Sequence, residues 1–339
     1  MALPDTRRKE VYILSIDGGG IRGFFSALLI EELFRRVRFL EAWMNRRRRW
    51  GKRPHRVAGD YFDLIAGTST GALIAISLSL PQPYPVGEIA DIYRRYGSAI
   101  FPRERFNLLR TVRHAFFEKY DATPLESVLR ELLGDTRLQE CRTNLLIPAY
   151  DTEDREPYFF KHRIGRDDED FYLRDVARAT TAAPTYFGPA HISALSGAEY
   201  TLTDGGIVAN NPAMSAFIEA WKLYPQARRF VVISFGTCYS GRRYPYEEIR
   251  KWGFIDWVSP VHGAPLMSML YDGQTKSVNH YLRKLPNLEY YRFDAPLGNV
   301  SDEMDDAGDL NLARIERLAR STIALKSREF HHIARLLAK

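Results

Sequence analysis

Short apolar segments alternate with longer amphipathic segments along most of the chain. Continuous apolar and β-branched runs predict buried strands at 11–16, 61–67, 143–151, 157–162, 201–206 and 229–236. Apolar residues at helical spacing predict helices at 24–44, 71–80, 173–184, 212–224 and 311–339. Strands that alternate with helices in this way predict an α/β fold, with a mainly parallel central sheet and helices on both faces.

Local signals refine some of these boundaries and the domain organisation. Pro184 is expected to end the helix that starts at 173, and Asn211 is expected to be the N-cap of the helix that begins at Pro212. The segment 82–140 is rich in proline, arginine and aromatic residues, and we interpret it as a cap-like insertion. The chain is predicted to form one domain, with a catalytic core at 11–215 and a C-terminal part at 216–339.

The charge of the chain is concentrated in one segment. Residues 35–56 hold ten lysines and arginines against the single Glu41, whereas the whole chain of 339 residues has a net charge of +6. Such a basic run favours an anionic partner, either phospholipid head groups or a nucleotide, although a solvated helix end explains it equally well. Two cysteines, Cys141 and Cys238, are too few for a disulfide framework or a structural zinc site. The lack of an N-terminal apolar stretch and of a membrane-spanning run predicts a soluble, cytoplasmic protein.

The stretch "LIAGTSTGALIAI" at 64–76 carries the first chemical signal. It matches Gly-x-Ser-x-Gly with a predicted strand before it and a predicted helix after it, which is the context of a nucleophile elbow. Gly67 and Gly71 allow strand and helix to approach closely, and Ser69 is held on a sharp turn with its hydroxyl above the sheet. We therefore predict Ser69 as a nucleophile; the alternative is a tight turn without chemistry.

A serine nucleophile needs a base. None of the eight histidines lies in a recognisable motif, so each is expected to be structural or exposed to solvent. Asp204, in "TLTDGGIVANNP", is the better candidate, because a carboxylate at the carboxyl end of a strand can meet Ser69 at the same edge of the sheet. It needs partial burial to become an effective base. The alternative for Asp-Gly-Gly is a surface turn.

The glycine-rich loop "DGGGIRG" at 17–23 is the third signal. Consecutive glycines before a helix expose backbone N–H groups, which can stabilise the oxyanion of an acyl-transfer reaction. Gly18, Gly19 and Gly20 are the predicted donors, and Arg22 is expected to add a positive charge. The loop also matches the dinucleotide pattern G-x-G-x-x-G. That pattern requires a second strand ending in an acidic residue, and here the predicted helix simply continues into the basic run.

Together these motifs resemble the patatin-like phospholipase family. The resemblance is carried by "DGGGIRG", "FDLIAGTSTGAL", "ARATTAAPTYF", "TDGGIVANNPAMSA" and "VVISFGT", which occur in the family's order over about 11–237. It implies a lipid acyl hydrolase with a Ser69–Asp204 dyad, no catalytic histidine, an oxyanion hole at residues 18–20 assisted by Arg22, and no cofactor or metal. Size, the motif set and the absence of an export signal also resemble bacterial patatin-like effectors of anti-phage defence, which are activated by a cyclic nucleotide.

The predicted function is therefore phospholipase A-type cleavage of acyl esters in membrane phospholipids, at the inner face of the membrane. The expected partners are the bilayer surface and a cyclic nucleotide activator; no DNA is expected, and a homo-oligomer is left open. Phe101, Phe106, Phe116 and Phe117 of the cap are candidates for an acyl channel, with ordinary core packing as the alternative. Two rival functions are a soluble esterase or thioesterase, and a membrane- or nucleotide-binding module without turnover.

Overall fold

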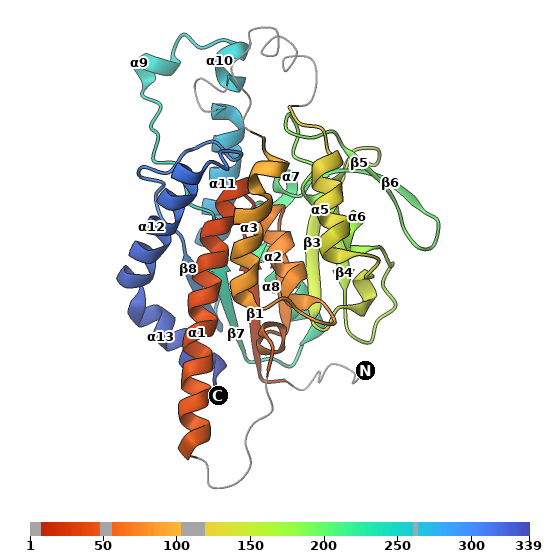
Figure 1. Cartoon of the computed structure of the whole chain (residues 1–339), viewed down its shortest axis with the longest axis vertical. Helices are drawn as coiled ribbons and strands as arrows, with labels where there is room; N and C mark the ends of the chain where they lie inside the picture. The colour runs from red at the N-terminus through yellow and green to blue at the C-terminus, as the bar shows by residue number, and fades with distance from the viewer. Residues whose placement is uncertain (1–7, 48–55, 103–118, 260–263) are drawn as a thin grey trace.

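A single mixed sheet forms the centre of the molecule (Figure 1). The structure, a computed structural model, describes residues 8–47, 56–102, 119–259 and 264–339. The sheet has the order β5-β6-β3-β2-β1-β7-β8, with β4 paired to β3. Its strands are β1 (Glu10–Ile16), β2 (Leu64–Gly67), β3 (Asn144–Asp151), β4 (Glu156–His162), β5 (Ala190–Ser193), β6 (Glu199–Asp204), β7 (Arg229–Phe235) and β8 (Leu288–Phe293).

The sheet has a parallel centre and an antiparallel edge. Strands β3, β2, β1, β7 and β8 run parallel to one another, as the alternating pattern predicts. Strands β4 and β6 run antiparallel to β3, and β5 runs antiparallel to β6. Asp204 therefore lies at the carboxyl end of a strand, as predicted, and this strand runs antiparallel to its neighbours β3 and β5.

Helices cover both faces of the sheet. On one face, Ala213, Ala216 and Ala220 of α8 (Ala213–Leu223) pack against Ile13 and Val232 in one apolar cluster. The other face carries a larger apolar cluster, to which α1, α2, α12 and α13 contribute. The α-helices in the described part of the chain are α1 (Gly23–Arg47), α2 (Thr70–Ser79), α3 (Val86–Ile100), α5 (Thr123–Leu133), α6 (Leu173–Thr180), α7 (Gly206–Ala209), α8, α9 (Tyr246–Ile249), α10 (Phe254–Val258), α11 (Pro265–Leu282), α12 (Asp309–Leu325) and α13 (Ser327–Leu337).

Several boundaries differ from the sequence-based predictions. Helix α6 ends at Thr180, four residues before Pro184, and the next hydroxyl, Thr181, donates to the carbonyl oxygen of Ala177 at 2.7 Å. The N-cap of α8 is Pro212 rather than Asn211, although the Asn211 side chain accepts a hydrogen bond from the N–H of Ala213. The C-terminal helical segment is two helices, α12 and α13, separated at Lys326.

The segment 82–140 contributes helices to the main body. Helix α3 packs against α1, and α5 packs against α6. Phe101 is partly buried against the rings of Tyr120 and Phe187. Phe106, Phe116 and Phe117 lie outside the described residues.

The basic segment 35–56 includes the second half of α1. This helix starts beside the glycine loop and runs past the opposite end of the sheet (Figure 1). Its 25 residues span about 38 Å at about 1.5 Å per residue. Glu32 and Glu41 already pair with Arg35, Arg36 and Arg56. The described part of the basic run therefore does not face the end of the sheet that carries Ser69; residues 48–55 lie outside the described part.

Cys141 and Cys238 are both buried and free. Within the described residues, no helix is long and apolar enough to cross a bilayer.

Candidate active site

Ser69 stands at the turn between β2 and α2 in a strained conformation. Its φ of 53° places a non-glycine residue in the left-handed half of backbone space, which is uncommon outside functional turns. The two flanking glycines make the turn possible. A Cβ on Gly67 would lie 2.2 Å from the carbonyl oxygen of Gly71, and a Cβ on Gly71 would lie 2.4 Å from that of Ile16. Any side chain at either position would therefore displace backbone.

The structure brings Ser69 and Asp204 into direct contact. The Ser69 hydroxyl donates to Oδ2 of Asp204 at 2.8 Å. The register of the sheet explains the meeting: Ala66 of β2 lies opposite Leu146 of β3, and Ala149 of β3 lies opposite Asp204. Three residues beyond Ala66, the chain has reached the level of Ala149. An antiparallel strand thus delivers the carboxylate to the same height as the serine.

Asp204 is almost completely buried, with 3% of its surface exposed. Burial raises the pKa of its carboxyl group to about 6, since a buried carboxylate loses its hydration. Hydrogen bonds from the Ser69 hydroxyl and from the N–H of Gly206, at 2.6 Å to Oδ1, act in the opposite direction. One carboxylate oxygen is therefore held by the backbone, and the other faces the serine.

The histidines occupy other places. Among the described histidines, none forms a hydrogen bond with Ser69 or Asp204: His162 bonds to Gln139, His191 to Thr201 and His332 to Tyr291. His280 and His331 are exposed on α11 and α13. His55, His114 and His262 lie outside the described residues.

The glycine loop 17–23 lies next to the serine. A Cβ on Gly18 would lie 3.3 Å from Cβ of Ser69 and 2.6 Å from Oδ1 of Asn210. The N–H of Gly18 donates to the carbonyl oxygen of Asn210 at 3.0 Å, so this donor is already used. The N–H groups of Gly19 and Gly20 have no acceptor among the described residues. Arg22 is buried, and its Nε donates a long hydrogen bond to the carbonyl oxygen of Gly19 at 3.5 Å. This contact helps to hold the loop in place.

A buried ion network holds the start of this loop. Arg292 of β8 donates to both carboxylate oxygens of Asp17, at 2.8 and 2.5 Å, and to Asp294 at 2.7 Å. Burial raises the pKa of Asp17 to about 6, and the charge of Arg292 opposes this rise. Thr237 adds a hydrogen bond from its hydroxyl to the carbonyl oxygen of Gly18 at 2.6 Å.

Replacing Arg292 with methionine is expected to lower the free energy of unfolding by about 3–5 kcal/mol, because the buried carboxylate of Asp17 and the partly buried carboxylate of Asp294 lose their common partner. Arg229→Met is the matched control: Arg229 also pairs with two acids, Glu10 and Glu289, but its side chain is 29% exposed. The control should lose no more than about 1 kcal/mol. Urea denaturation of both variants measures the difference, and equal losses would contradict the role given to the network.

Some residues that support Ser69 were not singled out by the sequence patterns. The hydroxyl of Thr180 accepts a hydrogen bond from the N–H of Ser69 at 3.1 Å and donates to the carbonyl oxygen of Pro148 at 2.7 Å. The hydroxyl of Thr70 lies 2.7 Å from that of Tyr93. Thr180 belongs to the motif "ARATTAAPTYF", so the motif was visible in the sequence, but its contact with Ser69 depends on tertiary structure.

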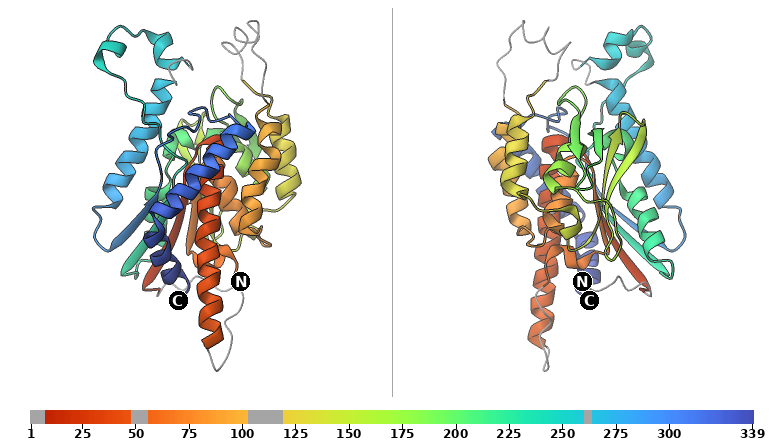
Figure 2. Two further views of the ribbon diagram at one scale, coloured as in Figure 1. Left: turned by 60° about the vertical axis from the view of Figure 1, so that its left-hand side comes forward. Right: turned by 90° about the vertical axis from the view of Figure 1, so that its right-hand side faces the viewer.

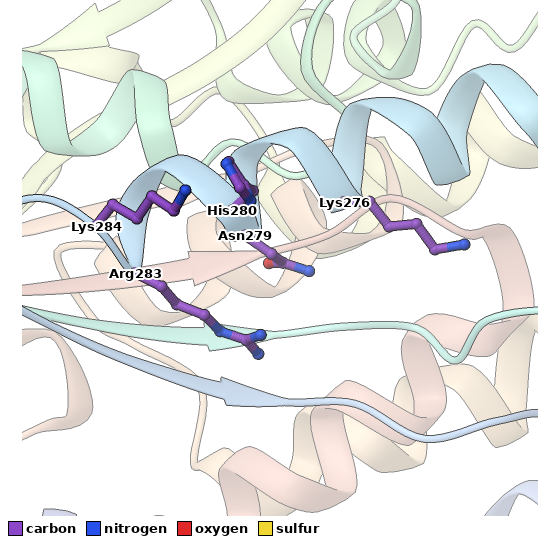
Figure 3. A pocket seen from close by; sticks show the side chains of 5 residues that line it. All are labelled: Lys276, Asn279, His280, Arg283 and Lys284. Carbon is purple, nitrogen blue, oxygen red and sulfur yellow. The ribbon is translucent and has the colours of Figure 1, made fainter.

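A separate surface cavity lies along α11. It has a volume of about 360 Å³ and is lined by Lys276, Asn279, His280, Arg283 and Lys284 (Figure 3). None of its lining residues belongs to the dyad or to the glycine loop. In the part of the chain that the structure describes, no group of three or more histidine, cysteine, aspartate or glutamate residues is arranged to hold a metal ion.

A strained serine on a strand–helix turn, paired with a second polar side chain beside a loop of free N–H groups, is the arrangement typical of serine acyl hydrolases. The family model described as patatin-like phospholipase matches residues 14–217, and the chain belongs to this family.

Its relatives match over most of their length. Patatin-like protein 2 of Oryza sativa subsp. indica is 32% identical over 91% of this chain and 83% of the relative. Patatin-like protein 2 of Arabidopsis thaliana is 31% identical over 93% of this chain and 82% of the relative. A protein of Solanum tuberosum named "Probable inactive patatin-3-Kuras 1" is 28% identical over 97% of this chain and 91% of the relative. The family supports lipid acyl hydrolase activity for this chain.

Proposed function

We propose that the protein is a phospholipase A-type enzyme that cleaves acyl esters of membrane glycerophospholipids through a Ser69–Asp204 dyad. The observation that carries this proposal is the 2.8 Å hydrogen bond from the Ser69 hydroxyl to the buried carboxylate of Asp204. The strained turn at Ser69 and the free N–H groups of the neighbouring loop support it.

In the proposed reaction, Oδ2 of Asp204 takes the proton of Ser69 as Oγ attacks the ester carbonyl carbon. The N–H groups of Gly19 and Gly20 stabilise the oxyanion, and Arg22 holds this loop through the carbonyl oxygen of Gly19. Gly18 is not an oxyanion donor in this scheme, because its N–H donates to the carbonyl oxygen of Asn210. A glycine is needed there because a Cβ would lie 2.6 Å from Oδ1 of Asn210. Asp204 then protonates the departing lysophospholipid oxygen. In the second half, Asp204 takes a proton from water as the water oxygen attacks the acyl carbon. Asp204 then returns this proton to Oγ of Ser69 as the acyl-enzyme bond breaks and the fatty acid is released.

Fatty acid release from phosphatidylcholine vesicles tests the substrate class. We expect the purified protein to release fatty acid in buffer with EDTA, because the dyad needs no metal, and to favour vesicles over a short soluble ester at equal ester concentration. Hydrolysis of the soluble ester alone would identify a soluble esterase or thioesterase instead. If the folded protein hydrolyses neither the vesicles nor the soluble ester, a binding module without turnover is favoured. This outcome is included because one relative is named as probably inactive.

Activation by a cyclic nucleotide, a role in antiviral defence and a cytoplasmic location at the inner face of the membrane stay predictions from the family resemblance. For the nucleotide, the cationic cavity on α11, with Lys276, Arg283 and Lys284, is the surface on which we propose an anionic activator binds. The vesicle assay repeated with a panel of cyclic nucleotides tests it: stimulation that Arg283→Glu removes supports activation, and equal rates with and without nucleotides contradict it.

A further inference from the structure

An exposed apolar lobe stands beyond the carboxyl edge of the parallel strands. It comprises residues 242–259 and 264–270, which form α9, α10 and the start of α11. Phe254 and Ile255 are 80% and 77% exposed, and Tyr246 is 73% exposed. Leu266 and Leu270 on α11 are 42% and 51% exposed. Both views in Figure 2 show the lobe projecting from the body at the end opposite to the two termini. Several large apolar side chains exposed on one projecting segment indicate an interaction site.

The lobe has an internal structure that keeps these side chains outward. The ring of Trp252 packs edge-on against Tyr244 and Trp257, with ring centroids 5.5 and 5.3 Å apart. Helix α10 begins with a hydrogen bond from the N–H of Gly253 to the Asp256 carboxylate at 2.9 Å, and it packs against α11. The three packed rings form the base of the lobe, while Phe254 and Ile255 project from α10 into solvent.

The same surface leads to the dyad along α11. Tyr271 follows Leu270 directly, and its ring lies against Gly206, where an added Cβ would be 3.3 Å from Cε1 of Tyr271. Gly206 in turn holds the Asp204 carboxylate through its N–H. The helix that carries the exposed leucines therefore also forms a wall of the site.

The charges of the lobe fit a lipid surface. Arg242 and Arg250 are paired with Glu248 and Glu247. Arg243 and Lys251 are exposed and form no ion pair with any residue that the structure describes. The lobe thus has a net charge of only +1, with two available cations next to the apolar side chains. Aromatic residues flanked by cations are typical of segments that lie in the head-group region of a bilayer.

We propose that the apolar lobe is the face with which the enzyme docks on a phospholipid bilayer. Phe254 and Ile255 insert among the acyl chains, Arg243 and Lys251 meet the lipid phosphates, and Tyr271 and the dyad face the membrane. This inference rests on the proposed phospholipase function. It places the docking face at the end of the sheet opposite to the basic part of α1, and it makes apolar insertion rather than charge the main source of binding.

Vesicle binding of the Ser69→Ala protein tests docking without hydrolysis. We expect the double substitution Phe254→Asp, Ile255→Asp to weaken binding to phosphatidylcholine vesicles by about tenfold or more. The matched control Phe39→Asp, Leu325→Asp alters side chains that are 69% and 87% exposed on α1 and α12 and should change binding by less than about twofold. Binding of the protein with an intact lobe should persist in about 0.5 M NaCl, where charge attraction is screened. Unchanged binding of the lobe variant, equal loss in the control, or no vesicle binding by the intact lobe would overturn the proposal.

Hydrolysis separates a failure of docking from a failure of the proposed function. In enzymes that retain Ser69, the ratio of vesicle hydrolysis to soluble ester hydrolysis should fall by about tenfold in the lobe variant; an unchanged ratio would overturn docking and leave phospholipase activity standing. If the wild-type enzyme hydrolyses neither substrate, the proposed function fails, whereas the binding comparison still decides on docking. Sedimentation velocity tests whether the lobe binds a second copy of this chain instead of a bilayer. A wild-type dimer that the lobe substitutions dissociate, with vesicle binding unchanged, would overturn the proposal.

Discussion

Replacing Ser69 with alanine is expected to lower kcat/KM for ester hydrolysis by about ten-thousand-fold or more, since no other group can form the acyl-enzyme. The fold should survive, because alanine retains the Cβ that the turn already accommodates at a φ of 53°. The unfolding midpoint in urea should therefore stay close to that of the wild-type protein. Initial rates on a short soluble ester measure the effect without any contribution from membrane binding.

A serine farther along the chain, within α2, provides the control. Ser77 of α2 is buried and donates to the carbonyl oxygen of Leu73 at 2.7 Å, two turns away from Ser69. Ser77→Ala should retain activity within about threefold, because it removes one local hydrogen bond. Substantial turnover by Ser69→Ala would show that another residue is the nucleophile.

Replacing Asp204 with asparagine is expected to lower kcat/KM by about a thousandfold or more, because an amide cannot take the serine proton. In the wild-type enzyme the carboxylate is the active form. Since burial raises the pKa of Asp204 to about 6, kcat/KM should rise with pH up to about this value and then level off. The remaining activity of Asp204→Asn should lack this rise. Rates on a soluble ester between pH 4.5 and 8 measure both effects.

Asp204→Asn should lower activity but leave the free energy of unfolding unchanged or higher at pH 7. A carboxyl group whose pKa is raised by folding contributes stability below its unfolded pKa of about 4, and this contribution is lost as pH rises through about 6. Asp204→Asn removes a buried charge and should unfold at a urea concentration equal to or above that of the wild-type protein at pH 7. Asp151→Asn, on the neighbouring strand, is the control: it also removes a buried carboxylate bonded to backbone N–H groups, and it should keep its activity. Full activity of Asp204→Asn would contradict its role as base.

The central strands were predictable because they are buried on both faces and are therefore apolar along their whole length. The first two helices were predictable because their apolar residues recur at helical spacing. Strands β1, β2 and β7 are almost entirely buried, which gives continuous apolar runs. Strand β5 and helix α11 have weaker patterns: in β5 buried and exposed positions alternate over only four residues, and α11 exposes several apolar side chains. Their place depends on tertiary packing rather than on local pattern.

For the site, the sequence indicated the residue types and the turn at Ser69, but not how the partners meet. Asp204 was selected because it ends a predicted strand, but the sequence did not show that this strand runs antiparallel and lies opposite Ala149. Gly18 was expected as a donor because it lies in a glycine loop before a helix, and only the fold shows that its N–H donates to the carbonyl oxygen of Asn210. Arg292 lies 275 residues from Asp17, so no local motif joins them.

Labelling with a fluorophosphonate tests the central claim most directly, because the reagent forms a stable adduct only with an activated serine. We expect a single adduct on the peptide that contains Ser69 in the wild-type protein, labelling slowed by at least about a hundredfold in Asp204→Asn, and none in Ser69→Ala. A folded wild-type protein that is never labelled, or a Ser69→Ala protein that is labelled as fast as wild type, would contradict the account.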